Sequence, residues 1–184
     1  MRVLHVSHQY HPAIGGSERY ITDLSEELAR RNHTVDVYTI GSTDYHAWRT
    51  VLPPVERINN VSVRRFHSLQ RGRLAWHLLA FALSNYNFAQ GCPRWLEPLL
   101  FYGNGPCSPA LFRAVLRTAH AYDLIHINQL HYAHAYTAFI AARLRKTPLV
   151  TTPHLHAEQP QTYAVGYMRQ VLRHSDAVLA VTAA

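Results

Sequence analysis

Short apolar runs alternate with longer amphipathic runs along this chain, and that alternation most constrains its fold. The runs RVLHVS (2–7), TVDVYTI (34–40) and DLIHIN (123–128) are short, β-branched and bounded by loops, as buried strands are. Further strands are predicted at 61–66, 148–153 and 176–182. Helical spacing of apolar residues predicts helices between them, at 17–31, 108–121, 131–146 and 162–175.

This order of elements predicts an α/β fold, a Rossmann-like doubly wound parallel sheet with helices on both faces. Strands that are apolar along most of their length favour a parallel sheet, because both of its faces are covered. The strand at 61–66 is more polar and is therefore expected nearer an edge. Residues 67–107 break the alternation and are predicted to form an insertion of one or two helices.

The composition fits a single globular domain with a basic charge. The chain has 184 residues, of which 48% are hydrophobic and 16% charged. The formal charge of +7, with His neutral, favours anionic partners such as phosphate-bearing substrates or anionic lipids. The basic residues form only short clusters and no nucleic-acid-binding motif is present, so we expect no nucleic-acid partner.

The cysteines and apolar segments indicate a cytoplasmic protein. Cys92 and Cys107 are too few for a disulfide framework or a zinc site, and we expect two reduced thiols. The N-terminal apolar run is too short for a signal peptide. The most apolar later stretch, 74–83, is shorter than the roughly 20 residues that cross a bilayer. We expect a cytoplasmic location, with attachment to the inner face of the membrane left open.

Two adjacent glycines, Gly15 and Gly16, stand between the first predicted strand and the first predicted helix, for which Ser17 is the expected N-cap. In such sheets ligands bind beyond the carboxyl ends of the strands, and glycines at a helix N-terminus let an anion approach backbone N–H groups. The pair therefore predicts a phosphate site or, alternatively, a turn with positive φ. The G-x-G-x-x-G and Walker A patterns are both absent, which argues against a nicotinamide dehydrogenase and a P-loop nucleotidase.

A longer pattern surrounds these glycines in residues 8–39. An aromatic residue and a proline precede Gly-Gly-x-Glu, and leucines, a histidine and alternating valines follow. The matching positions are Tyr10, Pro12, Gly15, Gly16, Glu18, Leu24, Leu28, His33, Val35, Val37 and Thr39, with Asn32 where a glycine is usual and a left-handed cap is expected. Residues 123–156 and 176–184 agree with the same pattern. The chain resembles glycosyltransferase family 4, the retaining glycosyltransferases of GT-B fold.

This resemblance implies a domain and an activity. Residues 1–184 would form a single N-terminal, acceptor-side domain, and the C-terminal donor-binding domain would be absent from this chain. The family transfers a sugar, with retention, from a nucleotide-diphosphate sugar to a hydroxyl acceptor, here lipid-linked or a polysaccharide. No cofactor or metal is expected. The last predicted strand is followed by no helix, so we expect a fragment that is inactive alone.

The resemblance also assigns site residues. His154 matches the family histidine that contacts the donor sugar and is the predicted catalytic residue, the alternative being a capping or core histidine. Contact with the donor phosphates or sugar is implied for Gly15, Gly16 and Glu18. Acceptor binding, or simply a surface position, is assigned to Tyr10, His11, Gln129 and His131.

Histidine pairs suggest a metal only weakly. His154 and His156 form H-x-H, and His131 and His134 lie three apart on a predicted helix. No carboxylate or cysteine stands at the spacing of a zinc motif, and histidine ligands normally come with further ligands. We therefore expect no metal site.

The insertion at 67–107 is rich in aromatic and basic residues. One interpretation is peripheral membrane association, either on an anionic surface or through a lipid-linked acceptor. The other is a small helical subdomain packed over the sheet. The residues concerned are Trp76, Phe81, Phe88, Trp95 and Phe101, near Arg64, Arg65, Arg71, Arg73 and Arg94.

Two other functions remain open at this point. The chain could be a non-catalytic module that binds an acceptor or a membrane while a separate subunit carries the donor site. It could also belong to another nucleotide-sugar enzyme, such as an epimerase. An epimerase needs an acidic catalytic base near a strand end, for which Asp44 and Glu158 are the candidates.

Overall fold

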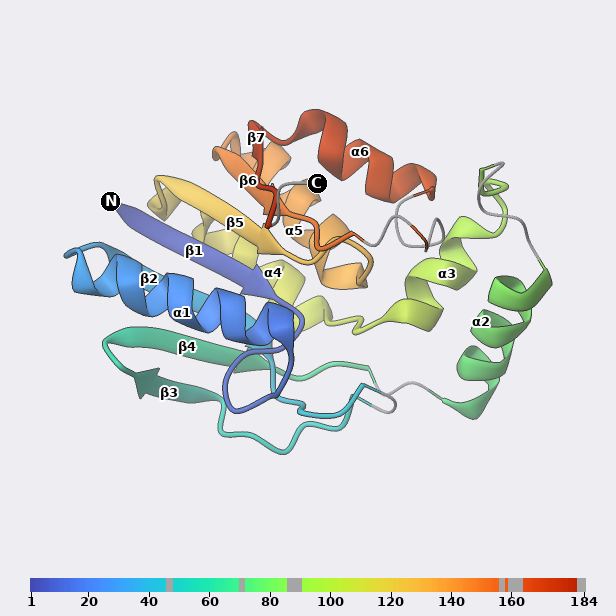
Figure 1. Ribbon diagram of the computed structural model, residues 1–184, viewed down its shortest axis with the longest axis horizontal. Coiled ribbons are helices and arrows are strands. Elements are labelled where there is room, and N and C mark those ends of the chain that lie inside the picture. Colours follow the sequence, from blue (N-terminus) through green and yellow to red (C-terminus); the bar gives the residue numbers. More distant parts are fainter. Residues whose placement is uncertain (46–47, 70–71, 86–90, 156–157, 159–163, 182–184) are drawn as a thin grey trace.

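The computed structural model describes residues 1–45, 48–69, 72–85, 91–155, 158 and 164–181 of the chain, arranged around one seven-stranded sheet (Figure 1). The strand order is β3-β4-β2-β1-β5-β6-β7. The strands are β1 (Arg2–Ser7), β2 (Thr34–Ile40), β3 (Val55–Ile58), β4 (Val61–Phe66), β5 (Leu124–Asn128), β6 (Leu149–Thr152) and β7 (Ala177–Val178). The reversal of order on either side of β1 makes the sheet doubly wound, which confirms the predicted fold class.

One edge of the sheet departs from the prediction of an all-parallel arrangement. β3 pairs with β4 in antiparallel orientation, whereas all other neighbouring strands are parallel. β3 was not predicted, because Pro53 and Pro54 precede it and its residues are mostly exposed. Its presence moves β4 one place in from the edge.

The helices follow the predicted order with slightly different bounds. They are α1 (Gly16–Arg30), α2 (Arg73–Asn85), α3 (Glu97–Asn104), α4 (Pro109–Thr118), α5 (Ala133–Arg145) and α6 (Gly166–His174), with a 3-10 turn at Ala119–Ala121. The N-cap of α1 is Gly15, and Ser17 lies inside the helix, so the predicted Ser17 cap was wrong. Asn32 takes the left-handed conformation expected after the helix, with φ of 63°.

The two faces of the sheet carry different side chains. Leu4 and Val6 of β1 and Ile125 and Ile127 of β5 belong to the core under α4, α5 and α6. Side chains alternate between the faces of a strand, so the intervening polar residues of β1 and β5 lie on the opposite face, which α1 covers (Figure 1). A second core there joins Ile21 of α1 to valines of β2 and β4.

The predicted insertion is a pair of helices, α2 and α3, that leaves and rejoins the domain at one place. Leu69 and Cys107 form an antiparallel bridge at its base, with the Leu69 N–H donating to the Cys107 carbonyl at 2.7 Å. The two helices pack closely, since a Cβ added at Gly103 would lie 2.8 Å from the Cβ of Leu79. Phe88, Arg71 and the side chains of Trp76 and Arg73 lie outside what the structure describes.

Candidate functional site

A cavity of about 840 Å³ lies at the carboxyl end of the sheet, where ligands of doubly wound sheets bind. The N-terminus of α1 and the segments after β2, β5, β6 and β7 surround it. The cavity brings together six predicted site residues: Gly15, Gly16, Glu18, Gln129, His131 and His154. Residues distant in sequence therefore meet at one site because parallel strands end on the same side.

The two glycines at this cavity differ in their surroundings. Gly15 is extended, with φ of 171°, so the turn with positive φ that was left open is absent here. A Cβ at Gly15 would lie 2.1 Å from Oε2 of Glu18, whereas a Cβ at Gly16 would have no heavy atom within 4 Å. Gly15 is therefore required by packing against Glu18, and Gly16 leaves space open at the helix N-terminus.

Glu18 is folded back under this loop and is only 2% exposed. Its carboxylate accepts hydrogen bonds from the Tyr45 hydroxyl at 2.9 Å and the Ser17 hydroxyl at 3.0 Å, and lies 3.1 Å from Nε2 of His8. Burial by itself raises the pKa of Glu18, but the contacts with His8 and Tyr45 outweigh it and hold the pKa below its ordinary value. The carboxylate is thus charged and already fully engaged, which suits a residue that holds the loop in place.

His154 enters the cavity directly after β6 and is oriented by Asn128 of β5. Its Nε2 lies 2.8 Å from Oδ1 of Asn128. The Asn128 amide nitrogen donates to the Ser17 carbonyl and to the Ser7 hydroxyl, each at 3.2 Å, which fixes the direction of the amide. Because an amide oxygen only accepts, His154 donates from Nε2, and in the neutral ring Nδ1 is the unprotonated nitrogen.

A chain of buried polar side chains leads from the centre of the sheet to His154. His5 and His126 face each other across β1 and β5, with their Nδ1 atoms 2.8 Å apart. Nε2 of His126 lies 2.8 Å from the Thr152 hydroxyl, which is 3.3 Å from the Tyr20 hydroxyl. The Tyr20 ring meets His154 edge to face, with ring centres 5.3 Å apart. Burial lowers the pKa of both His5 and His126, so both rings are neutral near pH 7.

The predicted acceptor residues divide into two groups. Gln129, whose amide donates to the Ser17 hydroxyl, and His131 both line the cavity. Tyr10 is instead buried in the core under α1, where burial raises the pKa of its phenol to about 12. His11 is exposed outside the cavity, and its carbonyl accepts from Arg65 at 2.7 Å. The structure thus does not bring Tyr10 or His11 to the cavity.

Three residues of the site escaped the sequence reasoning: Asn128, Tyr20 and Tyr45. The segment from 128 to 131 was identified as a strand end, but only contact geometry distinguishes Asn128, which orients His154, from its neighbours. Tyr20 lies on the apolar face of the predicted helix 17–31, where its hydroxyl is not distinguished from a packing position. Tyr45 lies in a loop without a local motif, although its hydroxyl holds Glu18.

The acidic candidates for an epimerase-type base have other surroundings. The Asp44 carboxylate accepts from the Ser42 hydroxyl at 2.9 Å and from the N–H groups of Trp48 and Arg49 at 3.1 Å, so it stabilises its own turn. Glu158 lies in an exposed turn. Among the described residues, no group of three or more His, Cys, Asp or Glu side chains is arranged to hold a metal ion.

The family comparison bears on this geometry directly. A model of the glycosyl transferase 4-like domain matches residues 15–184, which begin at the first of the two glycines. The chain belongs to this family. The resemblance to glycosyltransferase family 4 predicted from the sequence is therefore confirmed. None of the curated proteins matches the sequence.

Several solved structures have a fold similar to this chain over part of their length. Sucrose-phosphate synthase from Thermosynechococcus elongatus is similar over 97% of this chain and 42% of its own, with 21% identity and a TM-score of 0.51. Glycosyltransferase VinC in complex with dTDP covers 94% of this chain and 38% of its own, with 13% identity and a TM-score of 0.49. α,α-Trehalose 6-phosphate synthase from Burkholderia multivorans covers 96% of this chain and 39% of its own, with 14% identity and a TM-score of 0.40. This chain thus spans less than half the length of each of these proteins, and the likeness to the first supports the fold.

Proposed function

We propose that this glycosyl transferase 4-like domain is the acceptor-side half of a retaining glycosyltransferase. The whole enzyme transfers a sugar from a nucleotide-diphosphate sugar to a hydroxyl of a lipid-linked or polysaccharide acceptor. One observation carries the proposal: the open position at Gly16 and the oriented His154 share a single cavity at the carboxyl end of the sheet, in a chain of this family.

The chemistry follows from the helix N-terminus. Breaking the bond between sugar and diphosphate leaves negative charge on the leaving group. The first N–H groups of α1 have no partner within the helix, and the helix dipole adds a partial positive charge there. Donors that are already in place stabilise developing charge without reorganisation, which lowers the barrier to transfer. Gly16 lets the diphosphate approach because no side chain fills the space.

His154 is assigned to the donor sugar. Its Nε2 donates to Asn128, which fixes the orientation of the ring where it lines the cavity. Gln129 and His131, on the same wall, are assigned to the acceptor. Glu18 is assigned to the loop and not to the diphosphate, because a buried carboxylate would repel a second anion.

The test uses the intact protein that carries this chain, with a panel of nucleotide-diphosphate sugars and hydroxyl acceptors. We expect transfer with retained anomeric configuration, read by NMR of the product. His154→Ala should lower kcat by roughly 10²-fold. The control is His120→Ala, because His120 is an exposed histidine outside the cavity. Absence of transfer to any acceptor, or equal loss in both variants, would contradict the proposal.

A further inference from the structure

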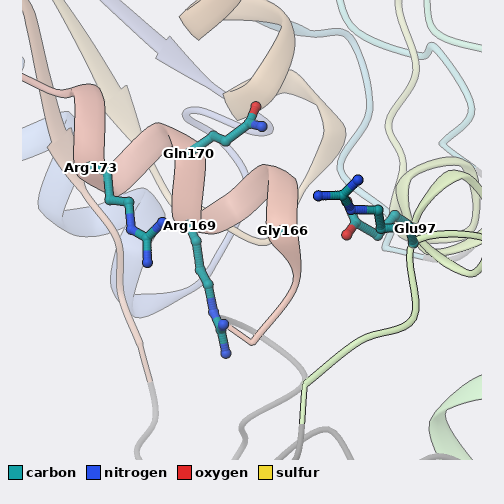
Figure 2. A pocket seen from close by; sticks show the side chains of 6 residues that line it. Glu97, Gly166, Arg169, Gln170 and Arg173 are labelled. Carbon is teal, nitrogen blue, oxygen red and sulfur yellow. The ribbon is translucent and has the colours of Figure 1, made fainter.

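A cluster of three arginines lies away from the cavity described above. Arg94 stands just before α3, and Arg169 and Arg173 lie four residues apart on α6, where they line a second cavity of about 540 Å³. Figure 2 shows the two α6 side chains reaching away from the helix on the same side. Within the described residues none of the three forms an ion pair with a carboxylate.

Glu97 is the one carboxylate among the described residues that line this cavity, and it already accepts a hydrogen bond. Oε2 of Glu97 accepts a hydrogen bond from the Tyr167 N–H at 3.3 Å, at the start of α6. A Cβ at Gly166 would lie 2.5 Å from Oε1 of the same side chain, which shows how closely the carboxylate sits against the helix N-terminus. Three positive charges therefore face one carboxylate, and the cavity suits phosphate groups.

An apolar groove of about 400 Å³ adjoins the arginines and shares Arg94 and Glu97 with their cavity. Its other lining residues are Pro98, Phe101, Tyr136, Thr137, Ile140 and Tyr167. Positive charge and apolar surface are thus contiguous, as required for a ligand with a phosphate head and a hydrocarbon body.

The insertion also carries exposed apolar side chains on both of its helices. On α2, Leu74, Leu78 and Phe81 are 73%, 40% and 61% exposed, at the spacing of one helical face. On α3 and the turn before it, Trp95, Leu99 and Tyr102 repeat that spacing and are 62%, 37% and 47% exposed. Large apolar residues grouped in this way on an exposed surface mark an interaction site.

Both apolar stripes lie on the same side of the helix pair. Five of these six residues come one position before a buried residue, whereas Leu83, also exposed on α2, follows the buried Ala82. The pairs are Leu78 and Leu79, Phe81 and Ala82, Trp95 and Leu96, Leu99 and Leu100, and Tyr102 and Gly103. Figure 1 shows the chain rising through α2 and descending through α3. In each helix the exposed residue precedes the buried one by one position, a rotation of about 100° around the helix axis. Because the two helices run in opposite directions, this rotation turns the exposed residues of both helices to the same side of the pair.

We propose that this surface, formed by α2, α3 and α6, docks on an anionic lipid bilayer. The leucines and Phe81 enter the interface, Trp95 and Tyr102 lie at the level of the head groups, and Arg94, Arg169 and Arg173 bind lipid phosphates. Charge complementarity selects this occupant, because among the described residues the three arginines form no ion pair and the Glu97 carboxylate beside them already accepts from the Tyr167 N–H. Arg65, which the sequence suggested for this role, is buried and paired with Glu56 at 2.7 Å. Among the described residues, no helix is long and apolar enough to span a membrane.

The inference goes beyond the proposed function, and its test needs no sugar donor. Binding of the intact protein is measured by flotation with phosphatidylcholine vesicles, with and without phosphatidylglycerol. We expect strong binding only with phosphatidylglycerol, falling as salt is raised. The double variant Arg169→Gln, Arg173→Gln should bind about 30-fold more weakly, the effect of losing two basic charges at an anionic surface. Leu78→Ser with Phe81→Ser should weaken binding at any salt concentration.

The matched control is Arg113→Gln with Arg117→Gln, because these arginines are also exposed and four residues apart, on α4 and outside the groove. It has the same net charge as the α6 variant and should keep most of the binding. An equal loss of vesicle binding in both double variants would show that only net charge matters, and would overturn the proposed lipid site. Absence of vesicle binding by the wild type would also overturn the proposal. So would a result in which Leu78→Ser with Phe81→Ser abolishes self-association of the protein but leaves its binding to vesicles unchanged.

A second readout guards against variants that fold poorly. Lipids brominated on their acyl chains should quench tryptophan fluorescence of the bound wild type, and Trp95→Phe should remove most of that quenching. Unchanged quenching in Trp95→Phe would place the bilayer elsewhere. Thermal unfolding midpoints of all variants should match the wild type, because the substituted side chains are exposed.

Discussion

Gly15 and Gly16 are adjacent glycines with different physical requirements. Gly15→Ala would press a Cβ against the Glu18 carboxylate, since the built distance is 2.1 Å. Gly16→Ala meets no atom within 4 Å. The first position is thus a packing constraint within the domain, and the second is open to whatever enters the cavity.

The two substitutions are expected to separate stability from donor binding. Gly15→Ala should destabilise the domain by about 1–3 kcal/mol, as overpacking does. Gly16→Ala should leave stability unchanged or raise it by about 0.5–1 kcal/mol, but raise KM for the nucleotide sugar roughly tenfold or more by blocking its approach. Urea unfolding and steady-state kinetics of the intact protein measure the two effects. Unchanged kinetics in Gly16→Ala would show that the diphosphate does not bind at this loop.

Asn128 acts on His154 through one contact, from its Oδ1 to Nε2 at 2.8 Å. In Asn128→Asp both side-chain oxygens accept, so the contact to the Ser17 carbonyl becomes unfavourable, while the contact to His154 becomes charge-assisted. We expect a higher pKa of His154, visible by NMR titration of its ring protons, together with a lower kcat. An unchanged histidine titration would show that Asn128 does not orient the ring.

Such contacts set the limit of sequence reasoning for single residues. The glycines, His154 and Gln129 were predictable because strand ends and a helix start place them in the cavity. The partners of Glu18 come from three separate segments, so only the folded arrangement shows that His8 and Tyr45 hold it. Tyr10 occupies a motif position but fills the core, because an aromatic ring in a family pattern can serve packing as well as binding.

Among the elements, the pairing of β1 with β5 has a consequence for pH. The paired residues His5 and His126 are buried at 1% and 2% exposure, and burial lowers the pKa of both. Below pH 6.5 the unfolded chain takes up protons that these folded rings do not accept. Stability contributed by this pair is therefore fully present above pH 6.5 and is lost as the pH falls.

We predict that the free energy of unfolding declines between about pH 6.5 and pH 4, the range set by the pKa of His126, which is lowered from 6.5 to about 4. That shift corresponds to roughly 3 kcal/mol at full effect. His126→Gln, a neutral side chain that keeps hydrogen-bonding groups, should flatten the decline. The slope should not vanish, because burial also lowers the pKa of His8 and His134. Urea unfolding across this range is the measurement, with His120→Gln as control; an unchanged slope in His126→Gln would contradict the assignment.

The elements themselves were largely predictable from periodicity, and the exceptions have physical reasons. Strands β1, β2 and β5 are apolar on at least one face and were found within a residue or two. The register that joins His5 to His126 was not accessible, because it depends on which strands become neighbours. β3 escaped because an exposed, charged strand of four residues has no apolar alternation.

For the whole molecule, the main expectation concerns what the chain does alone. This chain spans 42% of the length of sucrose-phosphate synthase, to which its fold is similar. We predict that the isolated 184 residues fold but transfer no sugar from any nucleotide-sugar donor. Radiolabelled donors, with the intact protein as positive control, measure this. Turnover by the isolated chain would show that the cavity at His154 needs no second domain.

The bridge between Leu69 and Cys107 has a consequence for how such a domain can vary. It closes the base of the helix pair as a neck, and the insertion also meets the rest of the domain through core side chains such as Leu79 and Leu100 and through Phe101. The entropic cost of closing a loop rises slowly with its length, by about 0.6 kcal/mol for each doubling of the number of residues. The segment between Leu69 and Cys107 can therefore be exchanged or extended while the sheet and the cavity stay fixed, provided that the apolar contacts with the core are kept. A scaffold with one such neck can direct the same chemistry to different cellular surfaces.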